Sequence, residues 1–410
     1  MPKLVILTQY YPPETGAPQN RLHSLSINMK KQGYDVSVFT GMPNYPKMEL
    51  HDEYKRKWFG KETIDGIVVW RSWLLVTEKS SIIFRLLNYF SFCFTSFFRM
   101  LLRMKKSDVL VCESPPLFLG MTAVLISWIK RTPLVFNVSD LWPKSAEELG
   151  LITNQTIIGM TTWLEEWIYK RSKAITGQTQ GIVADIKERF PNKPIHWLPN
   201  GVDAELLARD IAGLKDLREE LGISAAEFVI CYAGIIGHAQ GLEIVIETAK
   251  ALRNEAVTFI LAGSGPVLES LEKAKQEHNL EKVIFLGPLP KSDMPSVIAT
   301  QDAAFIPLKK SKLFLGAIPS KLFENSALKK PLLLGVDGEA KALFIDQGKA
   351  GLFYEPENTA ELVKCIKQLM SDKALVKELG ENGRAYVSTY FNRENIAISF
   401  HEFLKDSVIV

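Results

Sequence analysis

The chain alternates short apolar runs with amphipathic, helix-like segments, and this alternation restricts its fold more than any other feature. Each apolar run is long enough for one buried strand, and the segments between runs are long enough for helices. Strands that alternate with helices predict a parallel, doubly wound α/β sheet. In the first half the strand-like runs are 3–11, 36–40, 67–73, 109–112, 134–138 and 174–176, and the first helix-like segment is 21–31.

The alternation stops at the turn-forming residues Pro199–Asp203 and then starts again. A chain of 410 residues is long enough for two domains of roughly 200 residues each. We therefore predict two Rossmann-like domains, 1–200 and 201–390, followed by a C-terminal helix over 391–410 that can cross back to the first domain. In the second half the strand-like runs are 228–232, 258–261, 283–286 and 303–307.

The composition is that of a globular protein, with 47% hydrophobic and 23% charged residues. The 49 Lys and Arg residues against 46 Asp and Glu give a net charge of +3, so no overall charge excess indicates a nucleic-acid partner. The four cysteines form no Cys-x-x-Cys pair and the six histidines are scattered, so neither a disulfide framework nor a zinc site is predicted. No secretory signal pattern opens the sequence, and we expect a cytoplasmic protein.

The stretch Pro319–Ala340 carries the clearest binding pattern. Ser320 is a candidate N-cap for a helix that holds Lys321 and Glu324 in its first turn and is expected to close at the two lysines before Pro331. Free backbone N–H groups, the helix dipole and the lysine suit a phosphate, while the glutamate suits the vicinal hydroxyls of a ribose. The stretch therefore indicates a sugar-nucleotide site, although an ordinary capped surface helix has the same pattern.

Three further candidate positions follow strands of the first half. Gly16 lies in the loop after the first strand and can bring backbone N–H groups close to a phosphate or a sugar; a plain Pro/Gly loop is the alternative. Glu113 and Asp140 also follow apolar strands, where such sheets place their chemistry. An ionised Asp140 can bind sugar hydroxyls, orient an acceptor or stabilise positive charge. Helix N-capping is the alternative for both carboxylates.

Three glycine-bearing turns end strands of the second half, at 233–238, 262–266 and 287–290. The carboxyl ends of parallel strands lie at one edge of a sheet, so we expect these turns to form one rim. Gly237, Gly263 and Leu289 are the candidate nucleotide contacts in them.

Residues 81–106 are unusually rich in large apolar side chains for a soluble domain, and three arginines interrupt them. The arginines disfavour a membrane span, whereas aromatic rings beside basic groups are typical of a helix that lies in a bilayer interface. A helix buried against the sheet is the alternative. The candidate membrane or acceptor contacts are Phe90, Phe94, Phe98, Arg99 and Arg103.

Seven motifs occur in an order that resembles a known family. Together they resemble a retaining GT-B glycosyltransferase of family 4, and they span nearly the whole chain. The subgroup they resemble most is that of bacterial O-antigen and capsule transferases that transfer N-acetyl-L-fucosamine. The motifs are Tyr10–Glu14 with Gly16, Asp140–Pro143, Pro199–Asp203, Ala233–Gly234, Gln240–Leu242, Ala262–Gly265 and Pro319–Glu324.

This resemblance implies two Rossmann-like domains that face a central cleft, with the acceptor bound by 1–200, the nucleotide-sugar bound mainly by 201–390, and no metal or other cofactor. Glu324 matches the second Glu of the family's E-x7-E pattern, which implies a contact to the donor ribose. Gly16 matches the loop glycine that approaches the donor phosphates. Ser320 and Lys321 lie where the donor's sugar and phosphates reach the helix.

Three positions depart from the family pattern. The first Glu of E-x7-E falls at Gly316, so its contact to a sugar hydroxyl is absent or supplied from elsewhere. The common Arg and Lys after the first strand of the second domain fall near Ile235 and Gln240, which removes two phosphate cations and raises the importance of Lys321. Ser139 replaces the His that often precedes the aspartate of the first domain.

Retaining transfer passes through an oxocarbenium-like state while a nucleoside diphosphate leaves, so Lys321 and Asp140 are the predicted catalytic residues. The predicted reaction moves N-acetyl-L-fucosamine, or a related deoxy-amino sugar, from a UDP-sugar to a polyprenyl-diphosphate-linked saccharide in surface polysaccharide biosynthesis. The expected location is the inner face of the cell membrane, to which the enzyme binds peripherally. A nucleotide-sugar 2-epimerase of the same fold and a non-catalytic sugar-binding protein are the alternatives.

Overall fold

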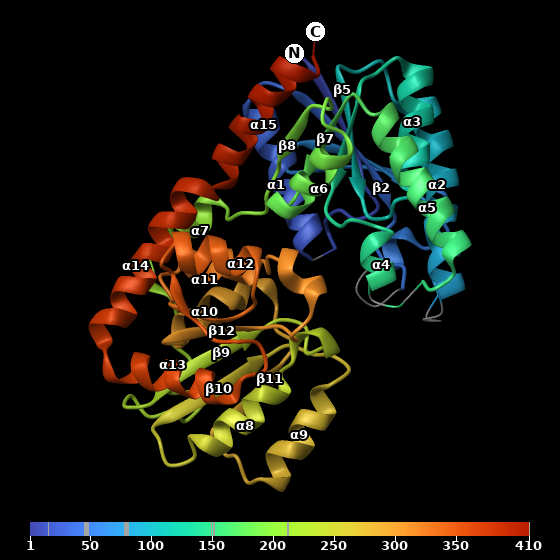
Figure 1. Ribbon diagram of the computed structural model, residues 1–410. Coiled ribbons are helices and arrows are strands. Elements are labelled where there is room, and N and C mark those ends of the chain that lie inside the picture. The colour runs from blue at the N-terminus through green and yellow to red at the C-terminus, as the bar shows by residue number, and fades with distance from the viewer. Residues whose placement is uncertain are drawn as a thin grey trace. The chain divides into compact units, whose positions relative to one another are not determined.

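The computed structural model describes residues 1–14, 16–44, 49–77, 82–148, 150, 152–210 and 213–409. The chain forms two compact units (Figure 1). Unit 1 comprises Met1–Asn200 together with Arg393–Val410, and unit 2 comprises Gly201–Asn392.

Unit 1 is built on an eight-stranded sheet with the strand order β3-β4-β2-β1-β5-β6-β7-β8. All neighbouring strands are parallel except β3, which pairs antiparallel with β4 at the sheet edge. The strands are β1 Lys3–Leu7, β2 Asp35–Gly41, β3 Phe59–Ile64, β4 Ile67–Ser72, β5 Val109–Ser114, β6 Leu134–Val138, β7 Ala174–Gly177 and β8 Ile195–Trp197. The helices are α1 Ala17–Lys31, α2 Ile82–Arg103, α3 Leu119–Lys130, α4 Lys144–Glu148, α5 Gln155–Arg171, α6 Gln180–Arg189 and α15 Arg393–Ser407.

Helices cover both faces of the unit 1 sheet, because successive side chains of each buried strand point to opposite faces. Val5 and Leu7 of β1 pack in a core with side chains of α2, α3 and α5. Leu4 and Ile6 pack in a second core with side chains of α1 and α15. The last helix of the chain is thus part of unit 1.

Unit 2 is built on a six-stranded parallel sheet with the order β11-β10-β9-β12-β13-β14. Its strands are β9 Phe228–Ala233, β10 Val257–Ala262, β11 Val283–Gly287, β12 Ala303–Pro307, β13 Leu332–Gly335 and β14 Gly351–Phe353. Its helices are α7 Ala204–Ala208, α8 Glu243–Ala251, α9 Leu268–Glu277, α10 Met294–Thr300, α11 Lys321–Ala327, α12 Glu339–Lys341, α13 Thr359–Ser371 and α14 Lys373–Tyr390.

The predicted doubly wound α/β architecture is confirmed in both units. In each sheet the strand order reverses at one place, between β1 and β5 in unit 1 and between β9 and β12 in unit 2. Ligands of open α/β sheets bind in the crevice at the carboxyl ends of the strands that flank this reversal. Functional side chains are therefore expected at these two places.

The edge strand β3 is not among the strands predicted from the sequence. Three of its six residues are polar and none is fully buried, so the segment carries a weak strand signal. A local signal was nevertheless present, since Asp65 and Gly66 both adopt positive φ in a two-residue turn between Ile64 and Ile67. An Asp-Gly pair between alternating residues is typical of a tight β-hairpin.

Candidate functional site

The clearest candidate site in unit 2 surrounds Lys321, the first residue of α11. Its ammonium nitrogen lies 3.6 Å from the ring centroid of Tyr232, in a cation–π contact at the end of β9. The Tyr232 hydroxyl donates a hydrogen bond of 2.5 Å to the carbonyl oxygen of Ile235, so the ring is held in place. The structure thus brings the end of β9 and the start of α11 together at the strand-order reversal.

Burial lowers the pKa of Lys321 to about 7, and the neighbouring Cys231 and Glu324 oppose this shift. A desolvated ammonium without a bound anion is costly, and a phosphate is the partner that would restore its charge. Glu324 lies one turn further along α11 and is half-buried. Lys321 and Glu324 thus lie in the first turn of the same helix, as predicted. Their roles in binding a phosphate and a ribose stay predictions.

The glycine turns after β9 and β10 pack against each other, as the predicted rim requires. Gly234 and Gly263 have φ of 147° and 146°, and a Cβ on Gly263 would lie 1.8 Å from the carbonyl oxygen of Gly234. The backbone N–H of Gly234 donates to Ala262 at 2.8 Å, and that of Gly263 donates to Gly287 at 2.7 Å. Glycine is needed at both turns, and the turns after β9, β10 and β11 are linked by hydrogen bonds.

Two other predicted donor contacts have ordinary local surroundings. Gly237 has φ of −116° and precedes a short 3₁₀ helix, His238–Gln240, so its backbone does not require glycine. Leu289 packs its side chain against a core cluster that contains Val297. Their roles in donor binding stay predictions.

The start of α11 differs from the predicted capped helix. Ser320 has a helical backbone conformation and its side chain makes no capping hydrogen bond, so the predicted N-cap is wrong. The backbone N–H groups of Leu322 and Phe323 already donate to Pro319 and Ser320 at 3.1 Å. The helix also ends at Ala327, before the two lysines. A seven-residue helix has a small dipole, so the positive charge of this site rests mainly on the Lys321 side chain.

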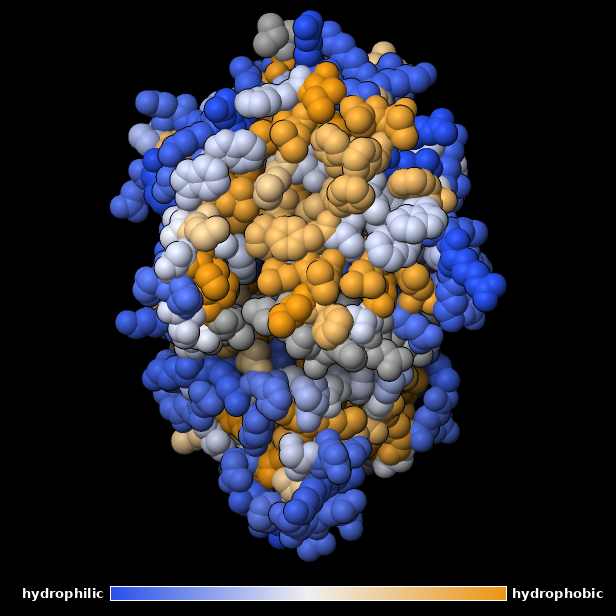
Figure 2. All heavy atoms as spheres, turned by 90° about the vertical axis from the view of Figure 1, so that its right-hand side faces the viewer, coloured by the Kyte–Doolittle hydropathy of each residue, from blue (hydrophilic) through white to orange (hydrophobic). Residues whose placement is uncertain are grey.

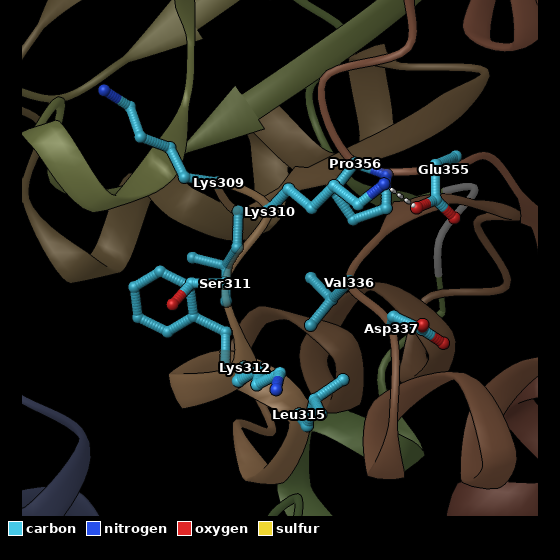
Figure 3. A pocket seen from close by; sticks show the side chains of 11 residues that line it. Lys309, Lys310, Ser311, Lys312, Leu315, Val336, Asp337, Glu355 and Pro356 are labelled. Carbon is cyan, nitrogen blue, oxygen red and sulfur yellow. Dashed lines mark ion pairs between the residues drawn. The ribbon is translucent and has the colours of Figure 1, made fainter. Parts of the chain in front are cut away.

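A pocket of about 280 Å³ opens at the carboxyl ends of β12, β13 and β14, and the sequence analysis did not single it out (Figure 3). Lys310 pairs with Glu355 at 2.8 Å on its rim. Gly338 allows the loop after β12 to approach, since a Cβ there would lie 2.2 Å from the carbonyl oxygen of Leu315. The volume of this pocket is near the lower end of the range for ligand pockets, which is roughly 300–1,000 Å³.

In unit 1 a buried ion pair joins α1 to the end of β5. Arg21 and Glu113 are 2.5 Å apart, and both side chains are almost fully buried. The Ser139 hydroxyl donates to Glu113 at 2.5 Å and accepts from Arg21 at 2.8 Å, while Asn137 donates to the other Glu113 oxygen. Glu113 is thus the centre of a polar network rather than a helix cap, so the capping alternative is wrong for it.

Asp140 follows this network directly. The Ser145 hydroxyl donates to its carboxylate at 2.9 Å, and burial raises its pKa from the usual value. The next helix, α4, begins only at Lys144, so Asp140 does not cap it. The carboxylate is held at the carboxyl edge of the sheet, where the prediction places it, and its role in transfer stays a prediction.

The loop before α1 is fixed by an arginine that the sequence analysis overlooked. Arg71 in β4 is fully buried and donates to the carbonyl oxygens of Gly41, at 2.9 Å, and of Pro12. Glu14 accepts from the backbone N–H of Asn44 at 2.8 Å. A lone arginine inside a strand pattern gives no local sign of such a role. The contacts tie the loop to β2 and β4.

Gly16 is the residue that precedes α1, with φ of 170°, an extended conformation open to any residue. A Cβ there would meet only the flexible side-chain oxygen of Gln19, at 2.4 Å. The fold alone therefore does not demand glycine at this position. Its approach to donor phosphates stays a prediction.

The predicted aromatic helix is α2, Ile82–Arg103. Phe90, Phe94 and Phe98 are 44%, 66% and 42% exposed. Arg99 instead turns inward: its guanidinium donates to the carbonyl oxygen of Gly60 at 2.9 Å and lies over the ring of Phe59. The membrane contacts of these residues stay predictions. Among the residues described by the structure, no helix combines the length and the apolar character that crossing a membrane requires.

Both halves of the chain match models of glycosyltransferase domains. Residues 16–201 match "Glycosyl transferase 4-like domain", and residues 214–386 match "Glycosyl transferases group 1". The chain is a GT-B glycosyltransferase of the group 1 and family 4 type. The predicted fold and family are thereby confirmed, whereas the N-acetyl-L-fucosamine subgroup is not addressed by these matches.

Similar proteins agree with this family. The glycosyltransferase is 26% identical over 386 residues to the "Putative colanic acid biosynthesis glycosyl transferase WcaI" of Escherichia coli (strain K12). The aligned region covers 90% of this chain and 91% of that protein. It shares its fold with Anabaena Alr3699/HepE in complex with UDP and glucose, with a TM-score of 0.72, 17% identity, and coverage of 99% and 100% of the two chains. It also resembles the catalytic domain of Starch Synthase IV from Arabidopsis thaliana bound to ADP and acarbose, with a TM-score of 0.73, 14% identity and 99% coverage of both.

Proposed function

We propose that this glycosyltransferase moves a sugar, with retention, from a UDP-sugar to a polyprenyl-diphosphate-linked saccharide in surface polysaccharide biosynthesis. The observation that supports it most is the position of Lys321 at the strand-order reversal of unit 2, with Glu324 one turn away. The sugar we propose first is N-acetyl-L-fucosamine or a related deoxy-amino sugar.

The reaction breaks the bond between the anomeric carbon and the diphosphate oxygen and forms a bond from the same face to an acceptor oxygen. Negative charge develops on the leaving diphosphate, and the Lys321 ammonium is the cation of unit 2 that we assign to it. The acceptor hydroxyl loses its proton to an oxygen of that diphosphate, so no protein nucleophile takes part. Asp140 would stabilise positive charge on the sugar or orient the acceptor.

The proposed lipid-linked acceptor fits the exposed aromatic residues of α2, since an acceptor with a polyprenyl chain stays in the bilayer. An enzyme that uses it works at the membrane surface, on the cytoplasmic side where nucleotide-sugars are made. We therefore propose that the enzyme associates peripherally with the inner face of the cell membrane.

The test is a matrix of UDP- and other nucleotide-sugars against polyprenyl-diphosphate acceptors that carry one sugar. We expect transfer from a UDP-linked N-acetyl-deoxyamino sugar, and a product whose anomeric configuration is that of the donor. Consumption of the donor without any acceptor, with a new nucleotide-sugar as product, would instead identify a 2-epimerase. Tight sugar binding with no turnover of any pair would identify a binding protein.

A further inference from the structure

A continuous apolar surface covers one side of unit 1, and α2 supplies only a part of it. Helix α2 packs against α3, and α3 packs against α5. Figure 2 shows their outward side chains gathered on one face in its upper half. The exposed large apolar residues of this three-helix face are Ile83, Leu87, Phe90, Phe94, Phe98 and Leu102 of α2, Met121, Leu125, Trp128 and Ile129 of α3, and Ile157, Met160 and Trp163 of α5.

Such a surface is unusual for a protein that is fully surrounded by water. Trp128, Trp163 and Met160 are 56%, 65% and 66% exposed, although the core beneath the same helices is well filled. Large contiguous apolar patches on soluble proteins mark a partner surface. Tryptophan in particular is enriched where apolar side chains meet the headgroup region of a bilayer.

The charged residues at the C-terminal ends of the three helices are mainly basic, although Lys170 pairs with Glu166 of α5 at 3.0 Å. The helices run in the same direction, because each connects two parallel strands of one sheet, so their C-termini lie together. Neither α2 nor α3 contains an acidic residue. The exposed basic residues at or just beyond the three C-termini are Arg103, Lys105, Lys106, Arg131, Lys170, Arg171 and Lys173.

The other end of the face lies at the catalytic edge of unit 1. The N-termini of α2 and α5, with Ile83 and Ile157, lie at the edge of the sheet where the strands end. Asp140 lies at that same edge, directly after β6. The apolar face therefore extends to the edge that carries Asp140.

We infer that the three-helix face is a docking surface for an anionic lipid bilayer, with the apolar rows of α2, α3 and α5 in the interface and the basic helix ends on anionic headgroups. Charge complementarity favours an anionic lipid surface as the occupant, because the rim is basic. A second copy of the chain would bring the same basic rim, and α2 and α3 carry no acidic residue that could pair with it. The inference rests on the proposed function only for the position of the acceptor. The binding itself requires no substrate.

The test compares flotation of the full chain with vesicles of phosphatidylcholine alone and of phosphatidylcholine mixed with phosphatidylglycerol. The wild type should float with the mixed vesicles at low salt and be partly released at high salt. The decisive variant is Trp128→Glu/Trp163→Glu, which leaves α2 untouched. Loss of two ring insertions should weaken binding at least about a hundredfold, from about 1.5–3 kcal/mol per buried ring.

A control places one new glutamate on the opposite helical layer of unit 1. Ile398 in α15 is 40% exposed, and α15 packs on the other face of the sheet. Ile398→Glu should therefore float like the wild type. Lys105→Gln/Lys106→Gln should weaken binding to mixed vesicles about thirtyfold, at about 1 kcal/mol per basic residue near an anionic surface, with little change on neutral vesicles.

Circular dichroism must first show that each variant has the native fold. If Trp128→Glu/Trp163→Glu unfolds, Trp163→Ser replaces it in the flotation test. A wild type that never floats, or a folded tryptophan variant that floats equally well, overturns the three-helix surface. A wild type that stays in solution as a dimer, and becomes monomeric in the tryptophan variant, assigns the face to a second copy and also overturns it.

A water-soluble acceptor with a short alkyl chain separates this inference from the proposed function. The tryptophan variant should keep transfer to that acceptor and lose transfer to an acceptor embedded in vesicles. Absence of transfer to either acceptor by the wild type refutes the proposed function, and the flotation result then still decides the docking surface.

Discussion

The pKa of Lys321 makes the proposed donor site testable by pH alone. Burial lowers this pKa to about 7. The lysine is therefore about half protonated at pH 7, about one-tenth at pH 8 and about one-hundredth at pH 9. If only the ammonium form binds a diphosphate, the dissociation constant of UDP should rise about fiftyfold from pH 7 to pH 9. The sign is fixed, since affinity must fall as the proton is lost.

Isothermal titration calorimetry of UDP with the wild type at several pH values measures the slope of the dissociation constant against pH. Lys321→Met should bind UDP about 10 to 150 times more weakly at pH 7, from the loss of a charge-assisted interaction of about 1.5–3 kcal/mol, and should show no such slope. Lys273→Met removes a well-exposed lysine of α9 and is the control for charge alone. A wild-type dissociation constant that is constant between pH 7 and 9, or a slope that persists in Lys321→Met, would refute the assignment of Lys321.

Three further outcomes are expected. Glu324→Ala should weaken UDP binding about 10- to 150-fold by calorimetry in a folded protein, because the ribose hydroxyls lose a charged acceptor; unchanged affinity would contradict the ribose contact. Asp140→Asn should abolish transfer without lowering the melting temperature, and because burial raises the Asp140 pKa, wild-type turnover should fall on acidification earlier than an ordinary carboxylate predicts. Arg21→Met should destabilise unit 1 by about 3–5 kcal/mol in urea unfolding, since it leaves the Glu113 carboxylate buried without a counter-charge; partial restoration of that loss by adding Glu113→Leu is the check.

The features that the sequence predicted correctly are those whose signals are local. The α/β alternation depends on apolar runs of a few residues. The placement of Lys321 beside Glu324 depends on a spacing of three on one helix. The aromatic helix α2 is apparent from its own composition. In each case the residues that carry the signal are close together along the chain, so no tertiary structure is needed to find them.

The features that the sequence did not reveal depend on contacts over long distances in the chain. Arg21 and Glu113 are 92 positions apart, and the sequence around either residue alone does not predict a buried ion pair. Arg71 reaches Pro12 across 59 positions. Helices α3 and α5 each expose only a few apolar side chains, and these become one surface only when the sheet places them beside α2. The predicted Ser320 cap is absent because the backbone N–H groups that its side chain would accept from, those of Leu322 and Phe323, already donate to the carbonyl oxygens of Pro319 and Ser320.

The return of α15 to unit 1 has a consequence for the order in which the chain can reach its native state during synthesis. Ala397, Phe400 and Leu404 complete a core whose other members lie near the start of the chain, and His401 hydrogen-bonds Tyr34 at 3.0 Å. Unit 2 is made from one continuous segment and can fold as soon as it leaves the ribosome. The half that is synthesised first therefore completes the core on the α1 side of its sheet only after residues 393–410 are made, and it is the half on which a chaperone would act longest.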